Sequence, residues 1–267
     1  MTQDEQWLLE EKYRGIMTPA FTTDRERLAR GEPLAYVIGS QPFLGLKIAL
    51  DSHPLIPRSE TEWWVEQLLA HMAGEHSKVF RSASARGTAI FQQKNTRPSN
   101  FTRHVRVLDL CAGSGAIGCA ILSYIKNAHV SFGEIDQAHE ATILKNIREN
   151  NLDASHAEVR IGNLFAPFAG EMFDVIAINP PYIPEGRVLD RSVIDHEPPQ
   201  ALFSGTDGLD LIRRIAADLP HYLAPSGTAW IEVDSAHIEA ALNLFTTEGF
   251  AAEILTDQYG RPRVIRI

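Results

Sequence analysis

Residues 105–125 read VRVLDLCAGSGAIGCAILSYI, and this stretch decides the fold class. Its first six residues form a short apolar run of the kind that becomes a buried strand. Gly113, Gly115 and Gly118 then spell G-x-G-x-x-G at the start of an apolar helical segment. A strand that enters a helix through such a turn is typical of α/β domains that bind nucleosides.

The alternation of strand and helix continues to the C-terminus. Four more strands are predicted, at HVSFGEI (129–135), AEVRIGN (157–163), FDVIAI (173–178) and GTAWIEVD (227–234). Helices are predicted at 137–150, 208–223 and 235–250, and AAEILTD (251–257) with RPRVIRI (261–267) is predicted to close the sheet as a hairpin. Strands that alternate with helices of this length predict an α/β fold with a doubly wound, mostly parallel sheet.

The first third of the chain has a different texture. Residues 1–33 are charged and predicted to be helical, and AYVIGSQPFLGLKIAL (35–50) alternates around GSQP as a β-hairpin would. SETEWWVEQLLAHM (59–72) predicts a helix, with Ser59 as its N-cap and Glu62 as the capping-box partner.

Residues 73–104 have no sustained period, which predicts a long loop or mobile insertion, or alternatively a basic contact surface for a partner. Together these patterns divide the chain into three parts. They are a helical and hairpin region (1–52), a linker helix with the insertion (53–104) and the main α/β domain (105–267).

Composition excludes several classes of protein. The formal net charge is −9, which argues against a protein that clamps a phosphate backbone, so no stable nucleic-acid binding is expected. No apolar stretch is long enough for a membrane helix, and the N-terminus lacks the features of a signal peptide. The two cysteines, Cys111 and Cys119, have no metal-ligand spacing, and no metal site is expected. We expect a cytoplasmic protein, or one of the mitochondrial matrix if the source is eukaryotic.

The glycine-rich turn admits two ligands and a third interpretation in which it binds nothing. Asp136, at the end of the next predicted strand, stands where a carboxylate would accept hydrogen bonds from ribose hydroxyls, as in a dinucleotide site. Asp109, however, puts an acid next to the turn, where it would repel a pyrophosphate and attract an ammonium group. S-adenosylmethionine carries adenosine, a sulfonium and an ammonium, and no phosphate. The acid therefore favours this cofactor.

The stretch INPPYIP (178–184) follows FDVIAI without a break. At the C-terminal end of a parallel strand, Asn179 should project into the ligand crevice. Its side-chain oxygen and the Pro180 carbonyl can accept hydrogen bonds from both hydrogens of a planar NH₂ group, while the Tyr182 ring packs against that group. The prolines fix the backbone and add no competing N–H. This arrangement suits methyl transfer to nitrogen, although a plain proline-rich loop is the alternative.

Several motifs indicate which kind of nitrogen would receive the methyl group. Six motifs carry a resemblance to a known family: GEPLAYVIGSQPFLGL, LIPRSETE, LDLCAGSGAIG, NPPYIP, EPPQALFSGTDGLD and YGRPRVIRI. Over about residues 31–72 and 105–267 the chain resembles the HemK/PrmC family of glutamine methyltransferases. The resemblance implies a seven-stranded Rossmann-like methyltransferase sheet, S-adenosylmethionine as cofactor and a class 1 peptide chain release factor as protein substrate. The acceptor is then the glutamine of its Gly-Gly-Gln tripeptide.

The resemblance also implies roles for particular residues. It places the cofactor on the turn formed by Cys111, Ala112, Gly113, Ser114 and Gly115, with Asp109 beside it, Asp136 on the ribose, Asn163 and Leu164 at the adenine, and Asn179 bordering it. Asn179 and Pro180 would grip the glutamine amide, and Pro181 and Tyr182 would line its slot. Arg58 and Glu60 would lie near the active site.

This sequence departs from the family's usual pattern in four places. The region before Gly31 is about half the usual length, Asn163 replaces a common acid, IEVDSAH (231–237) replaces a Glu-Ile-Gly pattern, and the insertion at 73–104 is atypical. NPPY is also shared with enzymes that methylate adenine or cytosine amino groups in nucleic acids, and this is the main alternative. A dinucleotide-dependent oxidoreductase and an inactive binding module are the others.

Overall fold

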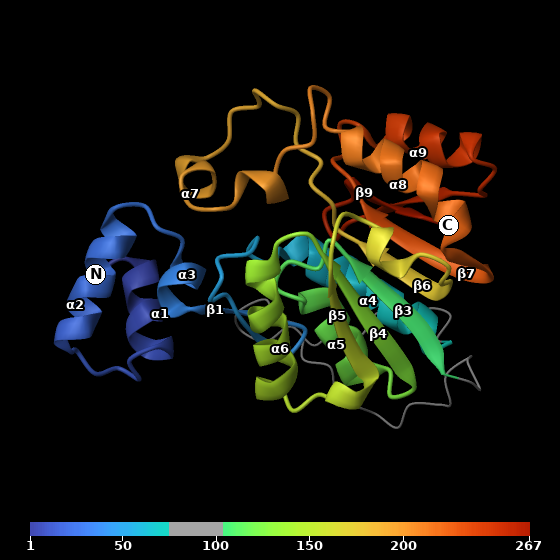
Figure 1. The fold of residues 1–267 in the computed structure, drawn as a ribbon. Coiled ribbons are helices and arrows are strands. Elements are labelled where there is room, and N and C mark those ends of the chain that lie inside the picture. The colour runs from blue at the N-terminus through green and yellow to red at the C-terminus, as the bar shows by residue number, and fades with distance from the viewer. Residues whose placement is uncertain (75–103) are drawn as a thin grey trace.

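A seven-stranded sheet forms the body of the protein, in the order β5-β4-β3-β6-β7-β9-β8 (Figure 1). The computed structural model describes residues 1–74 and 104–267. The strands are β3 (Val105–Leu110), β4 (Ala128–Glu134), β5 (Ala157–Ile161), β6 (Phe173–Ile178), β7 (Leu223–Glu232), β8 (Glu253–Thr256) and β9 (Pro262–Arg266). The strands from β5 to β7 in this order pair in parallel, and β9 is antiparallel to both of its neighbours. The predicted doubly wound sheet and its closing hairpin are confirmed.

Helices cover both faces of the sheet, because successive residues of a strand point to opposite sides. Val105 and Val107 of β3 pack with α4 (Ser59–Met72), α5 (Ala116–Tyr124) and α6 (Glu140–Glu149). Leu108 and Leu110 pack on the other face with α8 (Asp210–Asp218) and α9 (Ile238–Thr247). The central strand β6 is buried at all six positions, as an apolar run such as FDVIAI requires.

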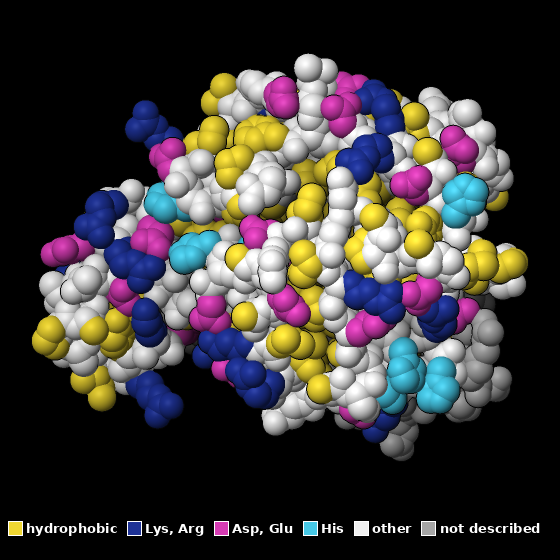
Figure 2. Space-filling model, viewed as in Figure 1, with side chains coloured by type: hydrophobic (Ala, Val, Ile, Leu, Met, Phe, Trp, Pro, Cys, Tyr) yellow, Lys and Arg dark blue, Asp and Glu magenta, His cyan; other side chains and the backbone are white. Residues whose placement is uncertain are grey.

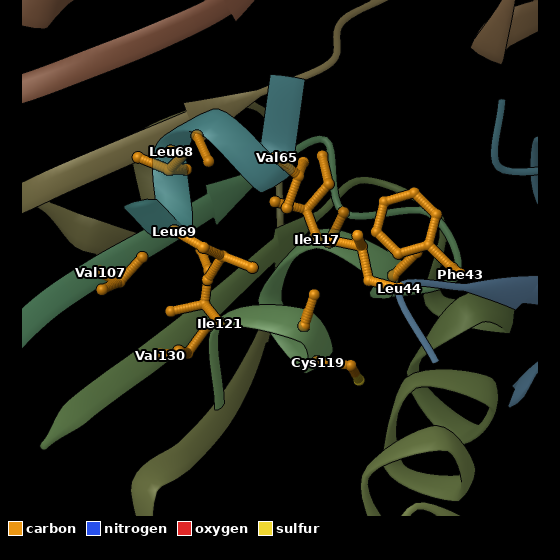
Figure 3. Packing of buried hydrophobic residues seen from close by; sticks show 14 of the residues in the cluster. Phe43, Leu44, Val65, Leu68, Leu69, Val107, Ile117, Cys119, Ile121 and Val130 are labelled. Atoms are coloured by element: carbon orange, nitrogen blue, oxygen red, sulfur yellow. The ribbon is translucent and has the colours of Figure 1, made fainter. Parts of the chain in front are cut away.

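Helix α4 is part of this core. Its apolar side recurs at helical spacing, and Trp64, Val65, Leu68 and Leu69 are at most 3% exposed. Figure 3 shows Val65, Leu68 and Leu69 gathered with side chains of α5 and of the sheet. The segment predicted as a linker helix therefore packs as one of the layers over the sheet. The loop predicted at 73–104 lies, apart from its end residues 73, 74 and 104, outside the described residues.

Three short helices precede the sheet, α1 (Gln3–Glu11), α2 (Pro19–Ala29) and α3 (Leu34–Ile38), and they stand to one side of it (Figure 1). Thr2 and Glu5 form a capping box at the start of α1. The three helices share a small core of their own, made of Leu8, Leu9, Phe21 and Val37. The helical prediction for residues 1–33 is confirmed.

The predicted hairpin is present, but it is shorter and turns elsewhere. Residues 34–38 form α3, which Gly39 ends in the left-handed conformation, and the strands are β1 (Ser40–Phe43) and β2 (Leu46–Ala49). The turn is Leu44-Gly45, with φ angles of 46° and 79°. The prediction of a turn around GSQP was therefore wrong, because Pro42 sits inside β1 and Gly45 supplies the positive φ that a two-residue hairpin turn needs.

The predicted capping box of α4 is also wrong. The N-cap is Arg58, and no side chain caps the helix there. The Glu62 carboxylate instead accepts the backbone N–H of Leu44 at 2.6 Å, and the Tyr124 hydroxyl donates to the Leu44 carbonyl at 2.8 Å. A tertiary hydrogen bond to the hairpin turn has taken the place of the local cap.

Two asparagines, Asn146 in α6 and Asn150 at its C-cap, attach the hairpin to the sheet domain. Asn146 Oδ1 accepts from Ala49 N at 2.7 Å, and Asn150 Oδ1 accepts from Lys47 N at 3.0 Å, so β2 gains side-chain partners for its outer edge. Asn146 Nδ2 also donates to the Ser114 carbonyl at 2.9 Å. One buried side chain thus ties the hairpin to the glycine-rich turn.

Within the described part of the chain, no helix has the length and apolar character needed to cross a bilayer.

Candidate active site

A cavity of about 300 Å³ opens at the C-terminal ends of β3, β4, β5 and β6. The loop that carries α7 (Arg191–Ile194) arches above this edge (Figure 1). The lining residues are Leu55, Leu110, Cys111, Gly113, Gly133, Glu134, Ile135, Asp136, His139, Gly162, Asn163, Leu164, Asn179, Pro181, Pro198, Gln200, Ala201, Phe203 and Leu211. The cavity is therefore lined by residues of two separate sequence motifs, the glycine-rich turn and NPPY.

The glycine-rich turn depends on left-handed backbone at alternate positions. Cys111, Gly113 and Gly115 have φ angles of 61°, 54° and 75°, and the Gly115 N–H closes the turn on the Ala112 carbonyl at 2.7 Å. A side chain on Gly115 would also press on Ile143 and Phe132 at 3.1–3.2 Å. Cys111 and Gly113 border the cavity, whereas Ala112, Ser114 and Gly115 form the supporting part of the turn.

Glu134 is a site residue that the sequence analysis missed. β4 ends at Glu134, two residues before Asp136. The Glu134 carboxylate accepts Gly113 N–H at 2.7 Å through Oε2, and it accepts the N–H groups of Ile135 and Asp136 through Oε1 at 2.8 and 2.9 Å. The signal for Glu134 in the sequence is its position near the end of the predicted strand, whereas Asp136 lies two residues beyond the end of β4.

Asp136 lines the same cavity, and its Oδ1 accepts from Ala138 N at 2.9 Å. Asn163 and Leu164 also line it, one strand further along the edge of the sheet. The Asn163 Oδ1 accepts from the Arg214 guanidinium at 2.9 Å. Leu164 has a φ of 49°, a left-handed conformation that turns the chain at this edge.

Asp109 lies behind the turn and does not border the cavity. It is fully buried, and its Oδ2 accepts from Gly118 N at 2.8 Å, so it caps the start of α5. Burial, with a further contribution from the nearby Glu134 charge, raises the pKa of Asp109 to about 8. Its Oδ1 is buried without a hydrogen-bond partner among the described residues.

The cavity suits a cationic nucleoside better than a dinucleotide. Glu134 and Asp136 supply carboxylates, and none of the described residues that line the cavity is Lys or Arg. The Gly113 N–H, which would otherwise face a phosphate, already donates to Glu134. A pyrophosphate would therefore meet negative charge and an occupied donor. The carboxylates at this cavity fit the ribose hydroxyls and the positive charges of S-adenosylmethionine.

The NPPY segment closes one side of the cavity. Asn179 and Pro181 line it, while Pro180 is buried and Tyr182 is half-buried just outside the lining set. The Asn179 Nδ2 donates to Thr61 Oγ1 of α4 at 3.2 Å, and the Tyr182 hydroxyl donates to Glu232 Oε1 at 2.9 Å. Burial and the Glu232 charge raise the pKa of Tyr182 well above its usual value, so Tyr182 keeps its proton.

The motifs LIPRSETE and EPPQAL meet through one buried carboxylate, that of Glu197. The Arg58 guanidinium donates to Glu197 Oε1 at 2.5 Å, and Ile56 N donates to Glu197 Oε2 at 3.2 Å. Glu197 directly precedes Pro198 and Gln200, which line the cavity. Arg58 thus holds a wall of the site, whereas Glu60 accepts from the neighbouring Ser59 hydroxyl and does not line it.

Among residues 1–74 and 104–267, no group of three or more His, Cys, Asp or Glu side chains could hold a metal ion.

Comparison with known proteins places these features in context. The family model "Methyltransferase small domain" matches residues 76–196. A release factor glutamine methyltransferase of Xylella fastidiosa is 35% identical over 92% of this chain and 80% of its own length. A bifunctional methyltransferase of Rickettsia felis is 31% identical over 96% of this chain, which spans only 49% of that relative.

Solved structures support the fold independently. The catalytic domain of hMettl16, in complex with a MAT2A 3'UTR hairpin, has a TM-score of 0.56 with 14% identity, over 84% of this chain and 74% of that one. At this identity the likeness concerns the fold alone.

Proposed function

The chain belongs to the release factor glutamine methyltransferase family, and we propose that it methylates the side-chain amide nitrogen of the glutamine in the Gly-Gly-Gln tripeptide of a class 1 release factor. The family predicted from the sequence motifs is confirmed. The observation that carries the activity is the meeting of Asn179 and Pro181 with Glu134 and Asp136 in one cavity. A donor pocket and an amide-binding segment adjoin there.

S-adenosylmethionine supplies an electrophilic methyl group on its sulfonium. Glu134 and Asp136 would accept hydrogen bonds from the ribose hydroxyls, and the turn from Cys111 to Gly115 would face the amino-acid part. Asn163 and Leu164 would border the adenine, and Asp109 would act from behind the turn. The volume of about 300 Å³ lies at the lower end of the range for small-molecule sites, roughly 300–1,000 Å³.

The substrate amide needs acceptors for both of its hydrogens. The Asn179 Oδ1 and the Pro180 carbonyl would supply them, because an amide nitrogen becomes a better nucleophile when these bonds draw it out of planarity. Pro181 and Tyr182 would flank the amide. Orientation at short range accounts for much of the rate in such a site, since about 7–11 kcal/mol of a barrier can come from positioning. No strong general base is required, because the proton becomes acidic only as the new C–N bond forms.

Nucleic-acid methylation is the less favoured alternative. The formal net charge is −9, and Figure 2 shows basic and acidic side chains of the described residues intermixed on the face that it draws. Phosphate-backbone binding depends on dense Lys and Arg. The likeness to an RNA-bound methyltransferase concerns the fold only, so a protein substrate and no stable nucleic-acid binding are the better-supported pair.

Two further features belong to the proposal. The free thiols Cys111 and Cys119 suit a reducing compartment, so we place the activity in the cytoplasm, or in the mitochondrial matrix for a eukaryotic source. We also propose boundaries near residues 52 and 104, with α1–α3 as a small unit that would contact the release factor and with α4 packed on the main domain.

The test is a methylation assay with labelled S-adenosylmethionine. The acceptors are a class 1 release factor, the same factor with its Gly-Gly-Gln glutamine replaced by alanine, and undermethylated RNA and DNA. We expect label on the unaltered factor alone. Label on nucleic acid alone would support the alternative, and binding of cofactor without any transfer would indicate an inactive binding module.

A further inference from the structure

A buried carboxylate stands behind NPPY and connects it to α4. Glu232, the last residue of β7, is 1% exposed. Its Oε2 accepts from the Thr61 hydroxyl and from Trp64 Nε1, both at 2.7 Å, and its Oε1 accepts from the Tyr182 hydroxyl at 2.9 Å. Three neutral donors from two segments thus converge on one acid. Burying a carboxylate costs free energy unless hydrogen bonds offset that cost, so packing alone does not account for Glu232 at this position.

The direction of these hydrogen bonds can be worked out from the groups themselves. The Thr61 hydroxyl has a single proton, and it donates that proton to Glu232 Oε2. Thr61 Oγ1 can then only accept from Asn179, which lies 3.2 Å away. The group of Asn179 that faces Thr61 must therefore be Nδ2. Asn179 thus donates to Thr61, and Thr61 donates to Glu232, so the two hydrogen bonds run in one direction.

The polarity matters because the two ends of an asparagine amide have nearly the same shape. With Nδ2 committed to Thr61, the oxygen remains available on the side chain that lines the cavity. In the flipped orientation Asn179 would present donors to an incoming NH₂ group, and donors would face donors. The same carboxylate holds the Tyr182 hydroxyl, so both polar side chains of NPPY depend on it.

We propose that Glu232, acting through Thr61, is a positioning residue that fixes the Asn179 amide with its oxygen toward the substrate nitrogen. This inference rests on the proposed methylation of a glutamine amide. Neither residue touches the substrate, and both act through Asn179.

The variants follow from the polarity. Thr61→Val keeps the shape and removes the relay, Glu232→Gln adds an NH₂ that permits the reversed polarity, and Thr61→Ser keeps the hydroxyl. Ser131→Ala is the matched control, because Ser131 is also a buried hydroxyl that donates to a glutamate, Glu158, at 2.6 Å, and it does not line the cavity.

Steady-state kinetics with a release factor separate positioning from folding. We expect Thr61→Val and Glu232→Gln to lower kcat by about 10-fold to 100-fold, the loss that a small misplacement of a reacting group produces. The Kd for S-adenosylmethionine should stay within about threefold, since binding does not use the relay. Thr61→Ser should recover most of the kcat lost in Thr61→Val, and Ser131→Ala should keep kcat even where it lowers the melting temperature. A Thr61→Val enzyme with unchanged kcat overturns the inference.

A second readout is independent of turnover. In protein labelled with ¹⁵N-asparagine, the side-chain NH₂ signal of Asn179 is assigned by its loss in Asn179→Ala. We expect that signal to shift in Thr61→Val and Glu232→Gln, and to stay in place in Thr61→Ser and Ser131→Ala. An Asn179 signal that ignores Thr61→Val also overturns the inference. If the unaltered enzyme fails to methylate a release factor, the proposed function fails, while the NMR result still decides the relay.

Discussion

The Glu134 carboxylate accepts the backbone N–H of Gly113 at 2.7 Å, and this bond joins the end of β4 to the glycine-rich turn. Glu134 therefore does two things at once. It holds the turn in place, and it puts a negative charge where a phosphate-binding turn would offer a free N–H.

We predict that Glu134→Ala weakens S-adenosylmethionine binding by about tenfold or more, since the loss of a hydrogen bond to a charged group costs roughly 1.5–3 kcal/mol. Asp136→Ala should weaken it less, because Asp136 contacts Ala138 and does not hold the turn. Titration calorimetry on both variants ranks them. An equal or larger loss in Asp136→Ala would return the main ribose contact to Asp136.

Replacing Asn179 separates transfer from cofactor binding. Asn179→Ala removes the proposed acceptor for the substrate amide, and we expect kcat to fall at least about 100-fold, as in other sites that lose a positioned group. The Kd for the cofactor should change by no more than a few fold, because Glu134 and the turn remain. Stopped assays and calorimetry on the same preparation check both statements, and turnover near the unaltered rate would contradict the amide-binding geometry.

The buried Asp109 predicts a pH-dependent stability. Its pKa is raised from 3.8 to about 8 in the folded protein, so the folded state holds this proton where the unfolded chain has lost it. The contribution of this proton to the free energy of unfolding is complete below pH 3.8 and is lost as the pH rises through about 8. Between these values the free energy of unfolding falls by up to about 1.4 kcal/mol per pH unit.

Asp109→Asn should therefore flatten the pH dependence of the free energy of unfolding between about pH 5 and pH 8. Urea denaturation of both proteins across that window measures the difference. Parallel curves for the variant and the unaltered protein would mean that Asp109 is ionised in the fold.

Helix α4 provides a test of the core. Leu68→Ala should lower the free energy of unfolding by about 2–5 kcal/mol, because Leu68 is fully buried against the sheet layer. Leu144→Ala is the matched control, since Leu144 of α6 is 47% exposed. Equal, small losses in both variants would mean that α4 is only a linker.

The periodicity of residues 105–125 was sufficient to predict the fold class, because buried parallel strands and their helices leave strong local patterns. The hairpin turn was predicted in the wrong place because Leu44 adopts a positive φ, which is unusual for a residue of its type. The capping role predicted for Glu62 was wrong because its carboxylate accepts the backbone N–H of Leu44 instead. Glu134 was passed over in favour of Asp136, since strand ends are uncertain by a residue or two.

The relay behind Asn179 could not be predicted from local patterns. Thr61 lies 118 residues from Asn179 and 171 residues from Glu232 in the sequence, and only the folded sheet brings α4, β7 and NPPY together. Motifs indicated that Asn179 acts on an amide, but the partners that orient it come from distant segments with no pattern of their own.

The central claim is that a glutamine side-chain nitrogen receives the methyl group. Tandem mass spectrometry of a release factor treated with this enzyme and S-adenosylmethionine tests it most directly, with the Asn179→Ala enzyme as control. We predict a single added methyl group on the amide of the Gly-Gly-Gln glutamine, and none from the control. A methyl group on any other residue of the factor, or an unmodified factor beside a methylated nucleic acid, would contradict the claim.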